Sequence, residues 1–346
     1  MRVLQALAGA QFGGAERFFE RLVPALGEDG IEQRVLIRKD ERREKLLTEA
    51  GITDLHPLAF GNRLDLLTRM AFRRSVRDFA PDIVFTWMSR ATAMAPKSPL
   101  GGKPFLRVAR LGGYYDLKYY QGCDHLIGDT QGVVDYLVRE GWPADRAVYL
   151  PNFVDATPGA AISRHDFYVP EGKPLLLALG RLHPNKGFDV LLKALAHLPE
   201  TYLLLAGTGP EREALEKLAV HEGVKPRVRF LGWREDVADL MATADLFVHA
   251  ARHEPLGNVI LEAWAHSVPV VATASDGPSL LIEDGATGLL TPLEDPVALA
   301  AAIKQALTDP AAAERMAKAG HKRYVRDFTR KAVVAQYRAF FERILG

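Results

Sequence analysis

Short apolar runs alternate with longer amphipathic stretches along the chain, and this alternation limits the possible folds more than any other feature. The apolar runs have the length of buried strands, whereas the stretches between them have helical periodicity. Regular alternation of this kind predicts parallel sheets covered by helices on both faces. We expect strands at Val3–Leu7, Val35–Ile37, Ile83–Trp87, Leu106–Val108, Leu126–Gly128, Leu175–Leu179, Tyr202–Ala206, Val228–Leu231, Leu246–His249 and Val268–Val271, and helices that include Ala15–Leu26, Leu64–Phe79, Val190–Leu198, Glu211–His221, Val237–Thr243 and Asn258–Ala265.

These strands fall into two series, separated by an irregular Pro-, Gly- and Ala-containing segment from Asp155 to Gly172. A chain of 346 residues is long enough for about two domains of ordinary size. We therefore expect an α/β fold with two Rossmann-like, doubly wound parallel-sheet domains that face each other across a cleft. The predicted domains span about residues 1–160 and 165–328.

Composition excludes several classes of protein. Lys plus Arg number 44 and Asp plus Glu 43, a balance that disfavours a nucleic-acid binder. The single cysteine, Cys123, excludes an intramolecular disulfide and fits a reducing compartment. No run approaches the roughly 18 apolar residues of a spanning helix. Met1–Ala10 loosely resembles a signal peptide, but Gln5 interrupts it, so a strand that enters a loop is the better interpretation. We expect a cytoplasmic protein.

Positive charge is concentrated in one part of the first domain. Between Arg63 and Lys118, eleven Lys or Arg residues face only four Asp, with aromatic residues interleaved. One interpretation is a solvated helix face above core aromatic residues. The other is a surface for an anionic acceptor or for a charged membrane leaflet.

The first candidate site is the loop Gly180–Gly187, GRLHPNKG, which directly follows a predicted strand. Loops at the carboxyl ends of parallel strands are where open α/β sheets bind ligands. Arg181 and Lys186 lie five residues apart across a Pro-containing turn, so both cations can reach one point in front of the next helix. A guanidinium and an ammonium together suit a diphosphate. The alternative is that both side chains merely cap or solvate the loop.

The second candidate site is Glu254–Glu262, EPLGNVILE, after the predicted strand that ends at His249. Asn258 can begin a helix, and the free N–H groups at a helix start form an anion site. Glu254 before this helix and Glu262 within it would flank the same ligand. A carboxylate can accept hydrogen bonds from vicinal hydroxyls of a sugar.

The third candidate site is the loop with Gly13 and Gly14, after the first predicted strand. Glycines allow the backbone to approach a ligand closely. The loop lacks the GxGxxG pattern of dinucleotide-binding proteins, and no acidic residue is clearly placed about 20 positions further on, so NAD binding is disfavoured. A simple strand-to-helix turn is the alternative.

These sites occur together with further motifs in an order that resembles the retaining GT-B glycosyltransferases of family 4, the glycosyl transferases group 1. The resemblance covers nearly the whole chain and is densest in the second half. The motifs are GGAE (Gly13–Glu16), PNFVD (Pro151–Asp155), GRLHPNKG (Gly180–Gly187), AGTGPE (Ala206–Glu211), FLGW (Phe230–Trp233), EPLGNVILE (Glu254–Glu262) and DGATGLL (Asp284–Leu290).

The resemblance implies a role for each candidate residue. Arg181 and Lys186 would bind the donor diphosphate and stabilise it as the leaving group. Glu254 would face the sugar hydroxyls, and together these three are the predicted catalytic residues. The other predicted donor-binding residues are Gly257 and Asn258 at sugar and phosphate, Glu262 at the ribose, Trp233 and Arg234 at the nucleobase, and Gly13 and Gly14 at the phosphates.

The resemblance also implies that no metal or other cofactor is needed, and the sequence has no Asp-x-Asp motif. It implies that a last helix, about residues 329–346, returns to the first, acceptor-binding domain. Many relatives carry a histidine near the sugar in the first domain, whereas this chain reads RLGGYYD from Arg110 to Asp116. Ser89, Arg90 or Asp116 could take its place, and Tyr114 is a further candidate on the acceptor side.

The expected activity is transfer of a sugar from a nucleotide-diphosphate sugar, with UDP favoured and GDP next, to a glycan or glycolipid hydroxyl. Retention would follow from front-face attack, with the departing phosphate oxygen accepting the acceptor proton. An anionic glycolipid, such as a lipopolysaccharide core intermediate at the cytoplasmic face of the inner membrane, is the hypothesis for the acceptor. Two alternatives remain: a sugar-nucleotide epimerase of the same architecture and a catalytically silent binding protein.

Overall fold

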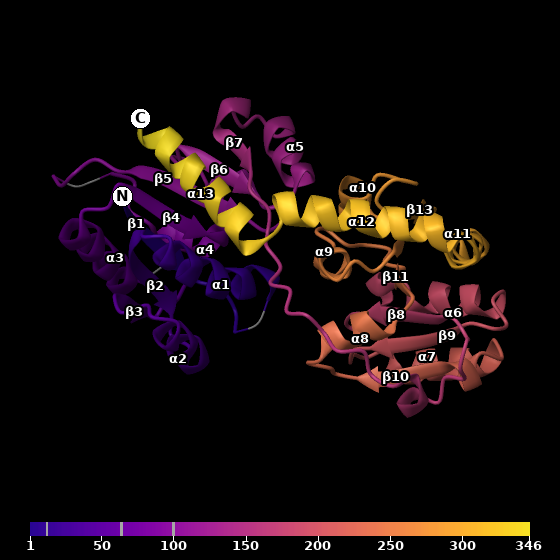
Figure 1. Cartoon of the computed structure of the whole chain (residues 1–346). Coiled ribbons are helices and arrows are strands. Elements are labelled where there is room, and N and C mark those ends of the chain that lie inside the picture. Colours follow the sequence, from indigo (N-terminus) through magenta and orange to yellow (C-terminus); the bar gives the residue numbers. More distant parts are fainter. Residues whose placement is uncertain (12, 63–64, 99–100) are drawn as a thin grey trace. The chain divides into compact units, whose positions relative to one another are not determined.

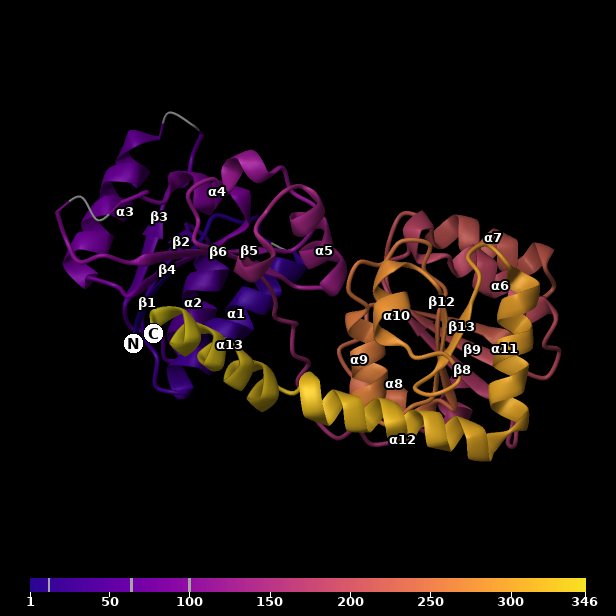
Figure 2. The same cartoon turned by 90° about the horizontal axis from the view of Figure 1, so that it is seen from above.

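The structure, a computed structural model, describes residues 1–11, 13–62, 65–98 and 101–346. Its chain forms two compact units (Figures 1 and 2). Unit 1 comprises Met1–Phe153 and Arg330–Gly346, and unit 2 comprises Val154–Thr329. Arg63 and the predicted helix start at Leu64 lie outside the described residues. No helix within the described ranges is long and apolar enough to cross a bilayer.

The described strands of unit 1 form one sheet, with every neighbouring pair parallel. Their order is β3-β2-β1-β4-β5-β6-β7, so the chain starts in the middle and reverses direction between β1 and β4. The strands are β1 (Arg2–Leu7), β2 (Glu32–Arg38), β3 (Leu55–Leu58), β4 (Ile83–Trp87), β5 (Leu106–Leu111), β6 (His125–Gly128) and β7 (Ala147–Tyr149).

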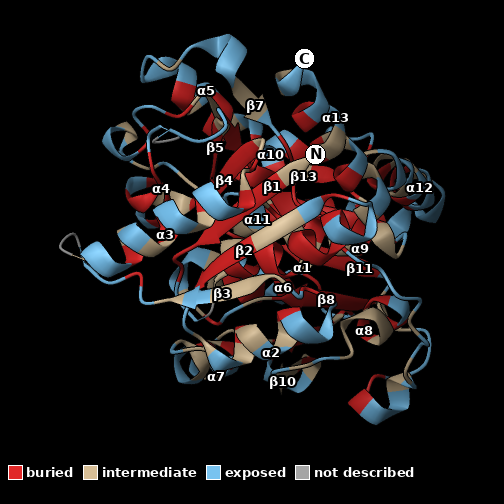
Figure 3. Cartoon of the chain, turned by 90° about the vertical axis from the view of Figure 1, so that its left-hand side faces the viewer, coloured by how far each residue is buried: buried red, intermediate tan, exposed pale blue. Residues whose placement is uncertain are grey.

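Helices cover both faces of this sheet because successive strand side chains point to opposite faces. Val3 and Phe85 pack in a core with α1 and α13, whereas Leu4 and Val84 pack in another with α3 and α4. Figure 3 shows this burial in the strands and on the inner faces of the helices. The α-helices of unit 1 are α1 (Gly14–Glu28), α2 (Glu41–Glu49), α3 (Leu66–Phe79), α4 (Met88–Met94), α5 (Gln131–Arg139) and α13 (Arg330–Leu345).

The last helix, α13, belongs to the core of unit 1 although unit 2 precedes it in the chain. Tyr337 and Phe341 on this helix are fully buried, and their rings lie 6.2 and 5.7 Å from that of Phe85. The buried Arg110 guanidinium donates a hydrogen bond to the Tyr337 hydroxyl over 2.9 Å. The apolar side chains of α13 therefore pack against the sheet of unit 1.

Unit 2 repeats the architecture with a parallel sheet in the order β10-β9-β8-β11-β12-β13. Leu176 and Ala178 face α6, α7 and α11, and Leu175 and Leu177 face α8, α9 and α12. Its described elements are β8 (Leu175–Leu179), α6 (Phe188–Ala196), β9 (Tyr202–Ala206), α7 (Arg212–His221), β10 (Val228–Gly232), α8 (Val237–Thr243), β11 (Leu246–His249), α9 (Asn258–Ala265), β12 (Val270–Thr273), α10 (Asp276–Leu281), β13 (Leu289–Thr291), α11 (Pro296–Thr308) and α12 (Pro310–Asp327).

The prediction of two Rossmann-like parallel-sheet domains is confirmed. The sequence pattern did not predict β3, β7 and β13, each of which lies at the edge of its sheet. They are only three or four residues long, and β3 contains Pro57, which an edge strand tolerates. β12 begins at Val270 instead of Val268, because the Val268 N–H group bonds to the Ala263 carbonyl at the end of α9.

Candidate active site

Two loops of unit 2 begin side by side where the strand order reverses. The sheet extends from β8 through β9 to β10 on one side, and β11 lies on the other side of β8. The loops after β8 and β11 therefore leave the carboxyl ends of adjacent parallel strands. This is the position at which open α/β sheets bind ligands.

The loop after β8 ends in a short 3₁₀ turn, Pro184–Lys186. At the start of this turn the His183 ring nitrogen Nδ1 accepts a hydrogen bond from the Asn185 N–H group over 3.3 Å. Gly187 follows with φ of 61°, and a Cβ atom added to it would lie 1.9 Å from the Ala250 carbonyl oxygen. Glycine is required here, because any larger residue would push the loop away from the end of β11.

Further bonds hold the two loops together. The backbone N–H groups of Arg252 and His253 donate to the Asn185 carbonyl oxygen over 2.9 and 3.2 Å. The Arg252 guanidinium also donates to both carboxylate oxygens of Asp189, in the first turn of α6, over 2.6 and 2.7 Å. Paired bonds of this kind give a fixed geometry. The side chains carried by the two loops are therefore positioned by one connected framework.

Glu254 is the centre of this framework. Its carboxylate forms an ion pair with the Lys186 ammonium, which comes from the other loop. The Gly257 N–H group donates to Oε1 over 3.2 Å, and the His249 Nε2 atom lies 3.5 Å from Oε2. The Glu254 side chain is 13% exposed and that of Lys186 is 27% exposed. Residues 68 positions apart thus form a charged pair at the edge of the sheet.

The charge state of Glu254 follows from these neighbours. Burial alone would raise its pKa, because it disfavours the ionised carboxylate. The contacts with His249 and Lys186 outweigh burial and hold the pKa of Glu254 well below its ordinary value. The carboxylate is therefore ionised throughout the physiological pH range and serves as a fixed acceptor of hydrogen bonds.

The start of α9 lies next to this pair. Gly257 is its N-cap residue, and no side chain caps the helix. Asn258, its first residue, has an Oδ1 atom that is buried and has no hydrogen-bond partner within the described part of the chain. Glu262 follows one turn later and is half-buried. An uncapped helix start presents N–H groups and a partial positive charge. Together with Lys186, this provides a positive environment for an anionic group.

The remaining predicted residues of unit 2 lie further along the same edge of the sheet. Arg181 is exposed at the beginning of its loop. Trp233, 62% exposed, and Arg234 follow β10, two strands away from β8, and Arg234 donates to Asp236 over 2.7 Å. All of them follow the carboxyl ends of strands β8 and β10, and their roles at the donor stay predictions.

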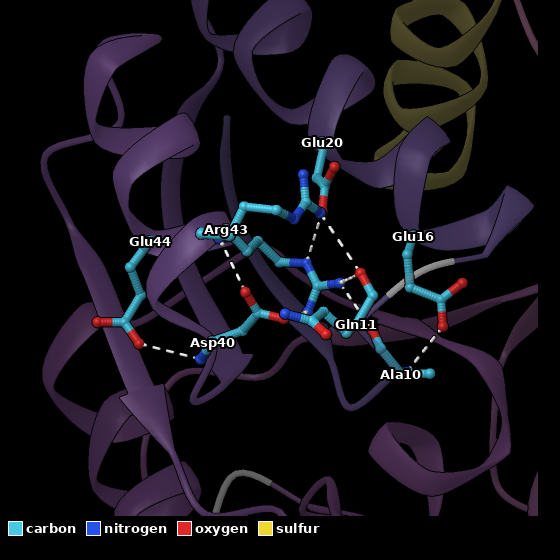
Figure 4. A network of polar contacts seen from close by, with 8 residues as sticks. Ala10, Gln11, Glu16, Glu20, Asp40, Arg43 and Glu44 are labelled. Atoms are coloured by element: carbon cyan, nitrogen blue, oxygen red, sulfur yellow. Dashed lines mark hydrogen bonds and ion pairs between the residues drawn. The ribbon is translucent and has the colours of Figure 1, made fainter. Parts of the chain in front are cut away.

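In unit 1, the contacts of Glu16 explain why the loop after β1 contains Gly13. Glu16 in α1 turns back and accepts a hydrogen bond from the Ala10 N–H group over 2.8 Å (Figure 4). A Cβ atom on Gly13 would lie 2.1 Å from the Glu16 carboxylate, so Gly13 makes room for this side chain. Gly14, the first residue of α1, is exposed and has open space around it. Of the two glycines, Gly14 is the one left accessible to a ligand.

The acceptor-side candidates are spread over two segments of unit 1. Ser89 and Arg90 lie in the first turn of α4, and Arg90 is exposed. Tyr114 stacks edge-on against Tyr136 with ring centres 5.2 Å apart. Asp116 is exposed and forms an ion pair of 2.5 Å with Lys118. The helix α4 packs against the short 3₁₀ turn Leu117–Tyr119, which directly follows Asp116, so the two segments lie side by side in unit 1.

Sequence reasoning missed His249. This residue ends β11, is 3% exposed and lies against Glu254. A histidine at the end of an otherwise apolar buried strand, directly before a candidate loop, was the available signal. No group of three or more His, Cys, Asp or Glu side chains in the described ranges has the arrangement of a metal site.

Two family models match the chain in succession. The model described as Glycosyltransferase Family 4 matches residues 12–157, and the model described as Glycosyl transferases group 1 matches residues 162–323. The first match falls almost entirely within unit 1, and the second lies within unit 2. The motifs that carry the candidate site around Lys186 and Glu254 lie in the second match.

Curated relatives match almost the full length. The lipopolysaccharide core biosynthesis glycosyltransferase LpsE of Rhizobium meliloti (strain 1021) is 38% identical over 329 residues, which are 94% of each chain. LpsD of the same organism, which has the same description, is 37% identical over 99% of this chain and 98% of LpsD. The chain therefore belongs to the glycosyltransferases of family 4, as the sequence motifs predicted.

The crystal structure of Anabaena Alr3699/HepE in complex with UDP has a similar fold. It covers 99% of this chain and 100% of that chain with a TM-score of 0.84 and 21% sequence identity. The likeness confirms the predicted GT-B fold class, with two Rossmann-like domains.

Proposed function

We propose that this glycosyltransferase transfers a sugar from a nucleotide-diphosphate sugar, UDP before GDP, to a hydroxyl of a lipopolysaccharide core acceptor with retention of the anomeric configuration. The observation that carries the proposal is the Lys186–Glu254 ion pair beside the uncapped start of α9. This arrangement offers one group for a phosphate and one for sugar hydroxyls at the same edge of one sheet.

The leaving group requires positive charge. Cleavage of the anomeric C–O bond leaves negative charge on the nucleoside diphosphate. Lys186 contacts Glu254 with one part of its ammonium, which has three donors, so donors remain for a phosphate oxygen. Arg181 is exposed nearby in the chain, and the N–H groups of α9 add to the positive environment. Preorganised donors of this kind contribute roughly 3–4 kcal/mol each to transition-state stabilisation. Metal ions are not part of the proposal.

Glu254 has the properties of an orienting group. Both of its carboxylate oxygens already have partners, and its lowered pKa keeps it ionised. In the proposed reaction the acceptor oxygen attacks the anomeric carbon on the face from which the diphosphate departs. The departing phosphate oxygen takes the acceptor proton, and Glu254 holds the sugar hydroxyls. The new C–O bond therefore lies on the same face as the one that breaks.

A thermal-shift panel with UDP, GDP, ADP, CMP and NAD, in EDTA, tests the donor site. At about 100 times its dissociation constant a ligand stabilises the fold by about 2.7 kcal/mol. We expect one nucleoside diphosphate, UDP first, to raise Tm by several degrees in the wild type and by much less in Arg181→Ala. Stabilisation by NAD, or by none of the five nucleotides, would contradict the proposal. A requirement for added Mg²⁺ or Mn²⁺ would contradict its metal-free part.

Acceptor dependence separates transfer from the two alternatives. The names of LpsE and LpsD make a lipopolysaccharide core glycan the first acceptor to supply. We expect release of the nucleoside diphosphate to require this acceptor and the product to keep the donor's anomeric configuration by NMR. Conversion of the donor without acceptor would favour an epimerase. Donor binding without any turnover would favour a silent binding protein.

Membrane contact is the second part of the proposal, and α3 supports it. The exposed face of α3 carries Leu66, Leu67 and Met70 in its first half, which are 64–80% exposed, and Arg73, Arg74 and Arg77 in its second half. Two other cations between Arg63 and Lys118, Arg107 and Arg110, are buried and cannot contact a membrane. Apolar side chains next to arginines are typical of helices that lie on anionic membranes. This would place the enzyme on the cytoplasmic face of the inner membrane.

A further inference from the structure

A concave region lies in unit 1, at the carboxyl ends of the adjacent strands β1 and β2. Its volume is about 600 Å³. The lining residues follow these strands directly, so the pocket belongs to the same edge of the sheet as Gly13 and Gly14. They are Gly9, Ala10 and Gln11 after β1, and Arg38, Lys39, Asp40, Glu41, Arg42 and Arg43 at the end of β2 and the start of α2.

One side of the pocket is built around a buried arginine (Figure 4). Arg43 is fully buried and donates to the Glu20 carboxylate of α1 over 2.8 Å. The same guanidinium donates to the carbonyl oxygens of Ala10 and Gln11 over 2.7 and 3.2 Å. Arg42 donates to Glu20 over 2.5 Å. These bonds connect α1, α2 and the loop after β1, so the pocket has a fixed shape in which two of its cations already contact Glu20.

The other two cations of the pocket remain available. Arg38 and Lys39 are exposed, and their side chains form no hydrogen bond or ion pair within the described residues. Of the two carboxylates in the lining, Asp40 accepts a hydrogen bond from the Arg43 N–H group over 3.0 Å as the N-cap of α2. Glu41 is exposed at the first position of the helix. The pocket therefore offers a guanidinium and an ammonium on consecutive residues, beside one uncommitted carboxylate.

The geometry points to an anion-binding subsite in which Arg38 and Lys39 hold a phosphate or carboxylate group of the acceptor glycan. The inference rests on the proposed function, which makes the acceptor an anionic core glycan. A planar guanidinium binds two oxygens of such a group, and the adjacent ammonium adds a point charge. The pocket is distinct from α3, so binding of a glycan anion and contact with a membrane use different side chains.

The donor is the other source of a phosphate, and the location weighs against it. The Lys186–Glu254 pair and the uncapped start of α9 already provide a phosphate environment in unit 2. Arg38 and Lys39 lie one strand away from the reversal point of the unit 1 sheet, beyond β1. We therefore assign an anion held there to the acceptor.

The test is calorimetric titration of a deacylated lipopolysaccharide core oligosaccharide against the wild type and Arg38→Gln/Lys39→Gln. The oligosaccharide is used intact, after removal of its phosphates with hydrofluoric acid, and after reduction of its carboxyl groups. The matched control is Lys304→Gln/Arg315→Gln, which removes two exposed cations from α11 and α12 of unit 2. UDP is titrated against all three proteins.

We expect the double variant to bind the intact oligosaccharide at least tenfold more weakly, with unchanged affinity for UDP and an unchanged Tm. Either removal of the phosphates or reduction of the carboxyl groups should weaken binding of the oligosaccharide to the wild type and to the control, again by at least about tenfold. The same treatment should not weaken its binding to the double variant further. That treatment identifies the anion.

Three results would overturn the inference. Equal oligosaccharide binding by the double variant and the control would exclude the subsite and leave the proposed acceptor unaffected. Weaker binding of UDP instead of the oligosaccharide would assign the two cations to the donor. Absence of oligosaccharide binding and transfer in the wild type would contradict the proposed acceptor as well, which separates this failure from that of the subsite.

Discussion

At the scale of single residues, Glu254 links two loops of unit 2 that are far apart in the sequence. Its carboxylate joins the ends of β8 and β11 through Lys186, and it also bonds to the backbone at Gly257. His249 lies beside it in the interior. The same contacts that keep the carboxylate ionised hold it in one position. A group positioned in this way can orient a sugar without rearrangement of the loops.

This arrangement predicts a pH-dependent contribution to stability. The pKa of Glu254 is lowered in the folded state, so the unfolded chain binds its proton more readily. The contribution is therefore present above the ordinary value of 4.5 and is lost as the pH falls below it. Glu254→Gln should lower the free energy of unfolding by about 1.5–3 kcal/mol at pH 7, because two donors lose a charged acceptor. Denaturant unfolding from pH 3 to 7 should show this difference shrink in acid.

The matched control is Glu235→Gln, which removes an exposed carboxylate from the same unit. It should change stability by less than about 0.5 kcal/mol at every pH. A difference between wild type and Glu254→Gln that stays constant with pH would show that the carboxylate contributes only through packing.

At the scale of elements, α3 has two faces of different character. Phe72, Val76 and Phe79 are buried against the sheet. Leu66, Leu67 and the arginines at 73, 74 and 77 face outward. The outward face adds nothing to the core, so its side chains can be changed without loss of the fold.

The variant Arg73→Gln/Arg74→Gln/Arg77→Gln should bind anionic vesicles more weakly. Each cation near an anionic membrane contributes about 1 kcal/mol. Arg74 and Arg77 lie 3.3 and 3.4 Å from Asp78, which offsets part of this contribution. We therefore expect roughly a 10- to 100-fold loss of affinity in co-sedimentation with phosphatidylglycerol-containing vesicles. Lys304→Gln/Arg315→Gln should bind as the wild type does. Equal sedimentation of the wild type with neutral vesicles would exclude an electrostatic contact.

At the scale of the whole molecule, the chain passes from unit 1 to unit 2 and returns. Val333, Tyr337 and Phe341 of α13 complete the core of unit 1, although they are synthesised last. Within unit 2, the Tyr324 hydroxyl donates to the Val154 carbonyl over 2.9 Å and so joins the last helix of the unit to its first residue. Unit 1 therefore depends on the end of the chain, whereas unit 2 is continuous.

Removal of residues 330–346 should unfold unit 1 selectively. Loss of a single buried aromatic side chain costs about 3–5 kcal/mol, and a domain is stable by only about 5–15 kcal/mol. Hydrogen exchange should show lost protection in β1–β7 and retained protection in β8–β13. Phe341→Ala is the milder test, with an expected loss of 3–5 kcal/mol in unit 1 alone. Full protection of β1–β7 in the truncated chain would show that α13 is dispensable.

Much of the fold could be read from local patterns. Apolar runs such as Leu175–Leu179 predicted strands with the bounds that the structure has, because a strand buried on both faces is apolar throughout. The start of α9 at Asn258 followed from the turn signals before it. The short edge strands did not follow, because they have only three or four residues, and β3 in addition has no fully buried residue and contains Pro57.

The sites required the three-dimensional structure to a greater degree. The order of the motifs along the chain was enough to identify the family. It also singled out Lys186 and Glu254 as candidate site residues, because each lies in a loop that follows a predicted strand. Their ion pair depends on sheet order, which places β11 beside β8 and not beside β10. Burial likewise separated Arg107 and Arg110 from the exposed arginines of α3. Local sequence determines whether a segment forms a helix or a strand, because the spacing of its apolar residues must match one of the two. Contacts between residues far apart in the sequence are determined by the packing of all elements together.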